Sequence, residues 1–403
     1  MLCPPPRASS TSETMADVKN AEAASARLAD QQASMMAAIQ TLVEVNSFTD
    51  NVEGGRAVGA LLQKETFAIA GLACEVKPST RYADHLVFRS SPVAGDSRAP
   101  VALVGHLDTV FPPGVFEGWK RDGELARGPG VLDMKGGLVV VAWALRAIAE
   151  TSGLASAAPV RLVVVADEEV GSPEGQAVIR DAVLGASAAL VFEAGRKADA
   201  IITRRKGTGG MTAIASGKAS HAGAAHKDGA NAIWALARFI DLAQRLTDYE
   251  RGITVNVGKV SGGQGKNTVP DRAEALIDLR FESHADGDAL VGALIEASVQ
   301  ACEVVGGTSL KMEGGIARLP LERTEASAAL YAAYAECARA SGLGHGEANL
   351  IGGGSDASTT HGMGIASIDG LGPRGIGFHT KDEQIEVASL VPKAQALARF
   401  LLR

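Results

Sequence analysis

The feature that most constrains the fold is a series of short apolar runs that alternate with helical stretches. Residues 101–104, 160–166 and 188–192 are almost entirely apolar, and residues 136–150 and 175–182 between them have helical spacing. Strands without polar alternation are covered on both faces, as in a parallel sheet flanked by helices. The sequence therefore predicts an α/β domain of three layers with a mainly parallel sheet.

A second pattern begins just after Lys206. The residues that follow predict four strands and two helices in the order β-α-β-β-α-β: strand 208–216, helix 229–246, strands 253–260 and 272–282, helix 286–305 and strand 308–313. This order is typical of a ferredoxin-like α+β domain. Helical stretches at 325–341 and 386–402 then resume the first pattern. The small domain is therefore expected to interrupt the α/β domain.

The expected organisation has four segments. A Pro- and Ser-rich N-terminal segment is expected to be disordered, and it lacks the apolar stretch of a secretory signal. A cytoplasmic location is therefore expected, with export left open. The expected boundaries are 1–17 for the disordered segment, 18–206 and 317–403 for the α/β domain, and 207–316 for the inserted domain.

Composition excludes several classes of protein. The net charge is 39 − 46 = −7, which offers little to phosphate backbones or anionic membranes. No apolar run approaches the roughly 20 residues of a membrane-spanning helix. The four cysteines are scattered without a CxxC pair, which excludes a disulfide scaffold and a cysteine zinc cluster. We expect neither a nucleic-acid nor a membrane partner.

Chemically active residues follow each of the three apolar runs. The first run is followed by His106 and Asp108, the second by the three acids 167–169, and the third by Glu193. Ligands of open α/β sheets bind beyond the carboxyl ends of the strands. Asp108 lies two residues from His106, so an extended backbone points both side chains the same way, and Asp108 is placed to fix the imidazole tautomer.

Asp133 adds a further carboxylate in the Gly-rich loop 128–137. Each motif alone is typical of a solvated turn or an ordinary ion pair. Together, so many carboxylates at one sheet edge need a neutralising cation. Imidazole and carboxylate ligands without thiols suit zinc, or less specifically cobalt or manganese, and their number indicates two ions.

The order of the motifs resembles that of the co-catalytic zinc peptidases, which include glutamate carboxypeptidases, aminoacylases and succinyl-diaminopimelate desuccinylases. Among these the chain looks most like the bacterial folate-hydrolysing glutamate carboxypeptidases. The resemblance extends from about residue 35 to the C-terminus. The matching motifs are His106–Thr109, Gly128–Gly137, Asp167–Glu169, Ser220–Gly223, Gly352–Asp356 and Gly377–Thr380.

The resemblance implies a set of metal ligands. Asp133 would bridge two Zn²⁺ ions, with His106 and Glu193 completing one site, and Glu169 and His379 the other. Without the resemblance, His379 reads as an ordinary histidine in a turn. The implied fold is the zinc-peptidase α/β domain interrupted by a lid that also forms a homodimer.

The resemblance also implies catalytic residues. Glu168 would be the general base, assisted by Asp108. His221 would stabilise the oxyanion from the inserted domain of the partner subunit; the alternative, a plain surface histidine, is the less favoured one. Four residues of the inserted and C-terminal segments would bind the substrate, namely Arg280, Asn267, Gly353 and Gly354. Arg280 could instead form only an ion pair with a neighbouring acid.

The expected function is hydrolysis of an amide bond next to a free carboxylate, in a small molecule or short peptide, with release of glutamate or a similar amino acid. An aminoacylase or deacylase of N-acyl amino acids is the first alternative. A non-catalytic relative that binds a small ligand through the metal is the second. The presence of Glu168 argues against that second alternative, because a binding protein has no need of a general base.

Overall fold

The computed structural model describes residues 14–91, 93 and 95–403, and the chain divides into two compact units. The first unit contains the described residues up to Ile201 together with Ala329–Gly346 and Asp369–Arg403, and the second contains Ile202–Ala328 and Glu347–Ile368. Each unit is described by itself below. The sequence-based boundaries of the inserted domain, 207–316, stay a prediction.

The N-terminal expectation needs a correction. Most of the expected disordered segment, residues 1–13, lies outside the described residues, but Met15–Asp17 already belong to helix α1 (Met15–Leu28). The hydroxyl of Thr14 accepts the backbone N–H of Asp17, and the Asp17 carboxylate accepts the N–H of Thr14. This reciprocal cap satisfies N–H groups that a helix start leaves open, so the helix includes the last three residues of the segment that was expected to be disordered.

The first unit is built on a sheet whose centre is parallel. Five of its strands lie in the order β1-β2-β6-β3-β7, namely β1 (Leu72–Lys77), β2 (His85–Ser90), β6 (Val160–Val165), β3 (Val101–His106) and β7 (Ala188–Val191). Strand β3 runs parallel to β6 and β7, while β1 and β2 add antiparallel strands at one edge. The central strands are almost wholly buried, as their apolar sequences predict.

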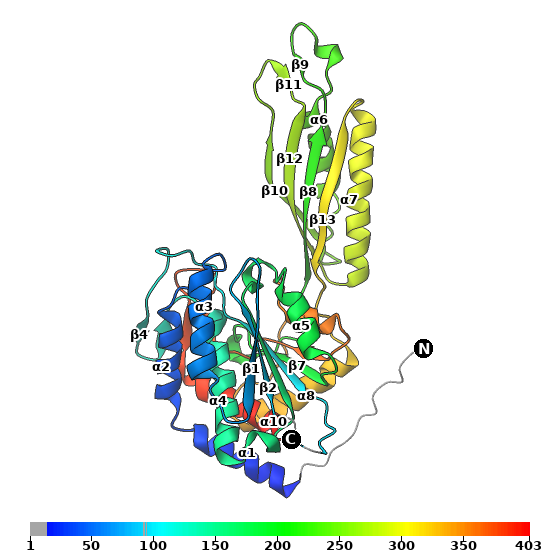
Figure 1. The fold of residues 1–403 in the computed structure, drawn as a ribbon. Coiled ribbons are helices and arrows are strands. Elements are labelled where there is room, and N and C mark those ends of the chain that lie inside the picture. Colours follow the sequence, from blue (N-terminus) through cyan, green and yellow to red (C-terminus); the bar gives the residue numbers. More distant parts are fainter. Residues whose placement is uncertain (1–13, 92, 94) are drawn as a thin grey trace. The chain divides into compact units, whose positions relative to one another are not determined.

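Helices cover both faces of this sheet. The chain moves from β3 to β6 in one direction and from β6 to β7 in the other, so right-handed crossovers place the two connecting helices on opposite faces. These helices are α4 (Gly136–Thr151) and α5 (Gly175–Val183), and they lie on the two sides of the sheet in Figure 1. The prediction of an α/β fold is confirmed.

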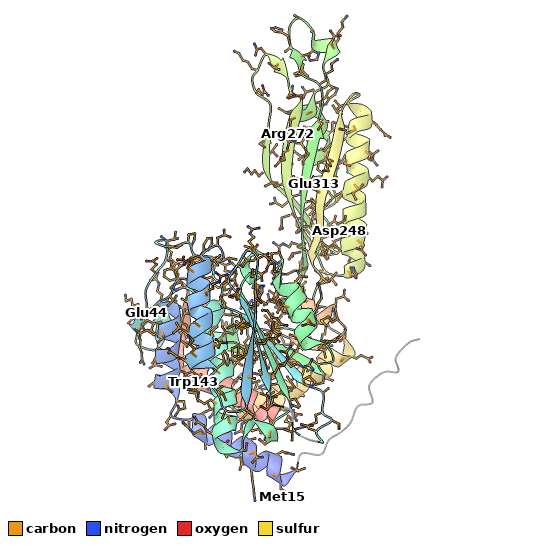
Figure 2. All side chains as sticks on the ribbon, viewed as in Figure 1. Met15, Glu44, Trp143, Asp248, Arg272 and Glu313 are labelled. Carbon is orange, nitrogen blue, oxygen red and sulfur yellow. The ribbon has the colours of Figure 1, made fainter. Side chains whose placement is uncertain are left out.

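Helix α4 is apolar over most of its surface because it lies between the sheet and an outer layer of helices. It contacts β3 and also packs against α1, α2 (Gln32–Val43) and α10 (Leu390–Leu401). Its Trp143 donates the indole N–H to the hydroxyl of Ser34 on α2, 3.1 Å away (Figure 2). The remaining long helices of this part of the chain are α3 (Val52–Leu61) and α8 (Glu325–Ala340).

A small second sheet of the first unit joins two segments that are far apart in sequence. Its strands lie in the order β15-β16-β5-β4, namely β15 (Gly375–Ile376), β16 (Gln384–Glu386), β5 (Leu125–Arg127) and β4 (Lys120–Asp122). Strand β16 pairs with β5, which immediately precedes the Gly-rich loop. The pairing therefore brings the segment around residues 377–383 next to the loop that carries Asp133.

The second unit contains the predicted ferredoxin-like arrangement. Its four long strands form an antiparallel sheet in the order β10-β12-β8-β13, with bounds Thr254–Gly262, Arg272–Phe281, Gly207–Ser216 and Ser309–Arg318. Helices α6 (Ala232–Gln244) and α7 (His284–Val304) contact each other and the sheet (Figure 1). Strands β8 and β12 alternate between buried and more exposed residues, as expected where helices cover one face.

Shorter elements complete the second unit. The two-residue strands β9 (Ser220–His221) and β11 (Thr268–Val269) pair with each other, and helix α9 (Ala357–His361) and strand β14 (Ser367–Ile368) come later in the chain. The β9–β11 pair was not predicted, because two-residue strands are too short to show a periodicity. Within the described part of the chain, Cys74, Cys302 and Cys337 are free thiols and none of the helices is long and apolar enough to span a bilayer.

Candidate metal centre

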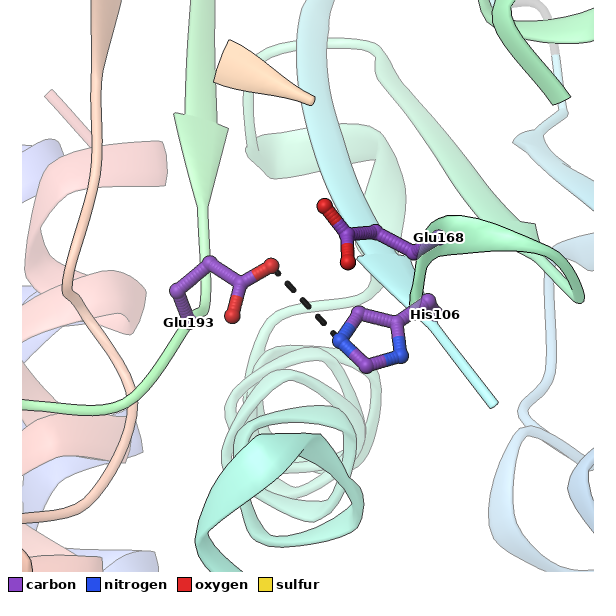
Figure 3. A group of neighbouring side chains, drawn as sticks. All are labelled: His106, Glu168 and Glu193. Carbon is purple, nitrogen blue, oxygen red and sulfur yellow. Dashed lines mark ion pairs between the residues drawn. The ribbon is translucent and has the colours of Figure 1, made fainter. Parts of the chain in front are cut away.

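The register of the parallel strands explains why ionisable residues gather at one edge of the first unit's sheet. Val101 pairs with Val160 on one side and with Ala188 on the other. The residues after these strands therefore emerge together, as expected at the carboxyl edge of a parallel sheet. Figure 3 shows His106, Glu168 and Glu193 turned toward one another at this edge, with ligand atoms within 4.8 Å of each other.

Asp133 joins two groups of side chains through its two carboxylate oxygens. Its Oδ1 lies 3.2 Å from Nε2 of His106, and its Oδ2 lies 3.3 Å from Nε2 of His379. His106 Nε2 is also 3.6 Å from Glu193 Oε1, and His379 Nε2 is 3.1 Å from Glu169 Oε2. The two groups are the pairs that the sequence resemblance implied, and they share one carboxylate.

Hydrogen bonding leaves the correct nitrogen of His106 available as a ligand. Its Nδ1 lies 3.0 Å from the backbone carbonyl oxygen of Asp108. A carbonyl oxygen can only accept, so Nδ1 carries a proton, and Nε2 is the nitrogen that faces Asp133 and Glu193. Metal-binding histidines are commonly oriented in this way.

The carboxylate of Asp108 holds the turn that carries the two glutamates. It accepts the backbone N–H of Glu168 at 3.1 Å and that of Glu169 at 3.2 Å. The hydroxyl of Thr49 donates to the same carboxylate at 2.8 Å. Asp108 therefore orients one histidine through its carbonyl group and two glutamates through its side chain.

The first of the three consecutive acids has a different task. Asp167 is buried, and its Oδ2 accepts the backbone N–H groups of Glu174 and Gly175 at 2.8 and 3.0 Å. These groups lie at the start of α5, where N–H donors lack partners within the helix. Asp167 thus anchors the helix that follows, while Glu168 and Glu169 face the cluster.

His379 reaches the cluster from an irregular turn. Its φ is +62°, a left-handed conformation that is uncommon for a residue with a Cβ, and Gly377 before it has φ +82°. Such a conformation costs on the order of 1–3 kcal/mol and persists where the surroundings fix it. No periodicity marks a turn of this kind, which is why the sequence pattern alone did not single out His379.

The electrostatics of the cluster fit a bound cation. Burial, with the charge of Asp133, raises the pKa of Glu193 to about 8, and burial also raises the pKa of Glu169. Hydrogen bonds to Asp133 and Glu169 raise the pKa of His379 to about 10. The negative charges of the buried carboxylates need to be neutralised, by protons or by a cation. Divalent metal ions that bind nitrogen and oxygen ligands can neutralise them. The donor set therefore fits divalent cations.

Two predicted residues of the second unit lie side by side. His221 on β9 pairs with Thr268 on β11, and Ala222 donates its N–H to the backbone oxygen of Asn267 at 2.9 Å. Nδ1 of His221 accepts the N–H groups of Gly223 and Ala224, both at 3.1 Å. In the neutral ring the proton is then on Nε2, which suits His221 as a hydrogen-bond donor.

The other predicted residues of the second unit have partners within it. Arg280 forms a two-pronged ion pair with Asp278, with both N···O distances 3.0 Å. The backbone oxygens of Gly353 and Gly354 accept from Nη1 of Arg205 at 3.1 and 3.4 Å. The ion pair that was the alternative for Arg280 is therefore present, and a role in binding substrate stays a prediction.

Comparisons with known proteins agree with this architecture. Residues 203–303 match the family described as "Peptidase dimerisation domain". The chain is 25% identical to carboxypeptidase G2 of Pseudomonas sp. (strain RS-16) over 380 residues, 93% of this chain and 90% of that protein. The chain is thus similar to M20 peptidases in this domain and to carboxypeptidase G2 over almost its whole length. The relationship extends over both units and is not confined to the matched domain.

Two further comparisons differ in how much of the chain they cover. Acetylornithine deacetylase of Myxococcus xanthus is 31% identical over 204 residues, 46% of this chain and 51% of that protein. The structure of an M20 family metallo-carboxypeptidase from Sulfolobus solfataricus has a TM-score of 0.71 at 17% identity, covering 91% of this chain and 98% of that one. At this identity the structural likeness shows the fold alone.

Two functional candidates were missed by sequence reasoning. Glu383 is almost fully buried, and its carboxylate accepts three backbone N–H groups of the loop that carries Asp133. Lys135 is also buried, and its Nζ donates to the carbonyl oxygens of Leu42 and Val45 at 2.9 and 3.0 Å. Glu383 lies in a polar turn and Lys135 in a Gly-rich loop, and neither segment has a periodicity that indicates which side chains are buried.

Asp356, in the Gly352–Asp356 motif, has a structural partner that gives a testable prediction. Its Oδ1 lies 2.5 Å from Nη1 of Arg318, and both side chains are buried. Replacing Asp356 with Ala is expected to lower the free energy of unfolding by about 3–5 kcal/mol, because Arg318 loses a buried counter-charge. Urea unfolding measures the change. As a control, Glu274→Ala breaks an exposed pair with Arg272 and should cost at most about 1 kcal/mol; equal losses would contradict the prediction.

Proposed function

We propose that this chain is a metal-dependent carboxypeptidase, which hydrolyses an amide bond next to a free carboxylate and releases a C-terminal amino acid such as glutamate. The observation that carries the proposal is the Asp133 carboxylate, whose two oxygens face two separate ligand groups with Glu168 beside them. Similarity to carboxypeptidase G2 over 93% of the chain supports this substrate class.

We assign two Zn²⁺ ions to the cluster, with Co²⁺ or Mn²⁺ as substitutes. Asp133 would contribute to both sites, and the other ligands are His106 and Glu193 for one, and Glu169 and His379 for the other. When bound, such ions supply Lewis acidity that lowers the pKa of water and polarises the amide carbonyl.

The chain's own residues would then move the proton and orient the reacting groups. Glu168 would accept a proton from the attacking water and pass it to the leaving amine, a role worth typically ~10²–10⁴-fold in rate. Asp108 would keep Glu168 in place through the backbone hydrogen bond of 3.1 Å. His221 of the partner subunit would donate from Nε2 to the oxyanion, since its Nδ1 already accepts two N–H groups.

The remaining predicted residues would bind substrate. Arg280 would hold the free carboxylate, because a guanidinium presents two parallel donors to it. Asn267, next to His221, would contact the same region, and Gly353 and Gly354 would allow the substrate backbone to approach closely. The homodimer that this arrangement needs is supported by the peptidase dimerisation domain at residues 203–303.

An N-acyl amino acid hydrolase remains the second candidate. The similarity to acetylornithine deacetylase over 204 residues favours it, because the same amide chemistry applies with selectivity on the acyl side. A metal-dependent binding protein without activity is less well supported, because Glu168 would then have no task.

A substrate panel separates these candidates. N-acyl and peptidyl amino acids with matched leaving groups are assayed with Zn²⁺ present, varying one side of the scissile bond at a time. We expect the largest changes in kcat/KM when the C-terminal amino acid is varied, with acidic residues preferred. Greater sensitivity to the acyl group would favour the deacylase, and no hydrolysis of any member would favour the binding protein.

A further inference from the structure

The buried carboxylate of Glu383 is bonded to the loop that carries the shared ligand. Glu383 is 1% exposed, and its Oε2 accepts the N–H of Gly130 at 3.1 Å. Its Oε1 accepts the N–H of Leu132 at 2.9 Å and that of Asp133 at 3.0 Å. One side chain therefore satisfies three donors of a single turn, including the backbone N–H of Asp133 itself.

The loop needs such a partner because it does not have helical hydrogen bonding throughout. Gly130 has φ +76°, and Asp133 and Met134 have non-helical backbone angles (φ −122°, ψ 91° and φ −134°, ψ 34°). Backbone N–H groups that point away from regular structure must find other acceptors when they are buried. Within the described residues, Glu383 supplies the acceptor for the N–H of Gly130, Leu132 and Asp133.

The other side of the loop is tied to different elements. Lys135 donates its backbone N–H to Gly130 at 2.7 Å, and its ammonium group donates to the carbonyl oxygens of Leu42 and Val45 near the end of α2. The loop is thus fixed at its C-terminal end by Lys135. Its N-terminal part, up to Asp133, depends on Glu383.

We propose that Glu383 is a positioning residue for Asp133, and that it fixes the direction in which the Asp133 carboxylate points toward its two ligand groups. Holding the N–H of Asp133 fixes the direction of its Cα–Cβ bond, and this direction sets the positions that its carboxylate oxygens can reach. The inference rests on the proposed function, in which Asp133 binds two metal ions. None of the hydrogen bonds described above joins Glu383 to the histidines or glutamates of the two ligand groups.

A glutamine in place of Glu383 tests this geometry. Its amide oxygen can still accept the N–H groups of Leu132 and Asp133, but its NH₂ group would face the N–H of Gly130, donor against donor. The loop must then shift or leave a buried donor without an acceptor. Glu383→Asp keeps the charge but is shorter by one CH₂ group, so it cannot reach all three N–H groups in the present geometry.

The experiment measures metal binding and not only activity. Metal-free Glu383→Gln is titrated with Co²⁺ and Zn²⁺ against a chromophoric chelator, the visible spectrum of the Co²⁺ form is recorded, and thermal unfolding is followed without metal. We expect metal affinity to fall roughly 10–100-fold, as for other groups that orient ligands, with a changed Co²⁺ spectrum. Glu386→Gln is the matched control, since Glu386 lies three residues away, is 51% exposed and pairs with Arg374; its metal affinity should stay within about twofold.

The outcomes separate positioning from simple stabilisation. Wild-type affinity and spectrum in Glu383→Gln would overturn the proposal, even if its melting temperature falls. Should Glu383→Gln fail to fold, Glu383→Asp takes its place, with the same expectation and the same overturning result. If the wild-type protein binds two ions but hydrolyses no amide, the proposed function fails while the role of Glu383 stands; if it binds no ion, both fail.

Discussion

Replacing Glu168 with glutamine is expected to lower kcat by about 10²–10⁴-fold while two metal ions remain bound. Glutamine has the same shape but does not accept a proton at neutral pH. The backbone N–H of residue 168 still bonds to Asp108, so the turn and the neighbouring Glu169 stay in place. Steady-state kinetics on the preferred substrate and metal analysis of the purified variant test the two halves of this expectation.

Glu174→Gln is the matched control for Glu168→Gln, and two results would contradict the role of Glu168 as the general base. Glu174→Gln changes a carboxylate that bonds to Thr80, outside the cluster, and should leave kcat within about twofold. Near-full turnover in Glu168→Gln would remove Glu168 as the base. Loss of one metal ion would instead make Glu168 a ligand, an assignment that its proximity to His106 and Glu193 also allows.

The part of the site that sequence could predict is the part built on parallel strands. His106 and Glu193 follow buried apolar runs, and the aligned ends of such strands bring their next residues together. Asp108 was predicted on the same ground, and its hydrogen bonds to His106 and to both glutamates are consistent with an orienting role.

The rest depends on irregular backbone, for which sequence offers no periodicity. His379 lies in a turn with φ +62°, so only the resemblance to a family identified it. Glu383 accepts from three N–H groups of a segment 250–253 residues earlier, a contact that no local pattern encodes. The early start of α1 at Met15 came from the cap formed by Thr14 and Asp17, inside a segment whose composition predicted disorder.

The fold of the second unit was easier to predict than its chemistry. The alternation along β8 and β12 indicated a half-covered sheet, and the observed strand bounds lie within a few residues of the predicted ones, with the largest difference at the end of β13. Arg280, by contrast, has a side chain that serves an ion pair and a substrate site equally well. Two nitrogens of Arg280 each donate to one oxygen of the Asp278 carboxylate. A substrate carboxylate would need the same two parallel hydrogen bonds.

Asp133→Asn is expected to abolish activity and to weaken the binding of both metal ions, not of one. The carboxylate is the only group that faces both His106 and His379 through separate oxygens, among the contacts described for the cluster. The loss of affinity should exceed the roughly 10–100-fold that follows removal of a group that merely orients a ligand. Metal titration of the apoprotein gives the two dissociation constants, and chelation of the wild-type enzyme followed by addition of Zn²⁺ or Co²⁺ should abolish and then restore hydrolysis.

The melting temperature provides an independent measure of how Asp133→Asn affects metal binding. A metal ion that binds only the native state at 100 times its dissociation constant stabilises it by about 2.7 kcal/mol. Wild-type protein should therefore gain melting temperature on addition of Zn²⁺, while Asp133→Asn should gain little at the same concentration. Glu386→Gln, whose carboxylate lies outside the cluster, should gain as much as wild type. An unchanged gain in Asp133→Asn, or loss of only one of the two ions, would show that the two ligand groups do not depend on a shared carboxylate.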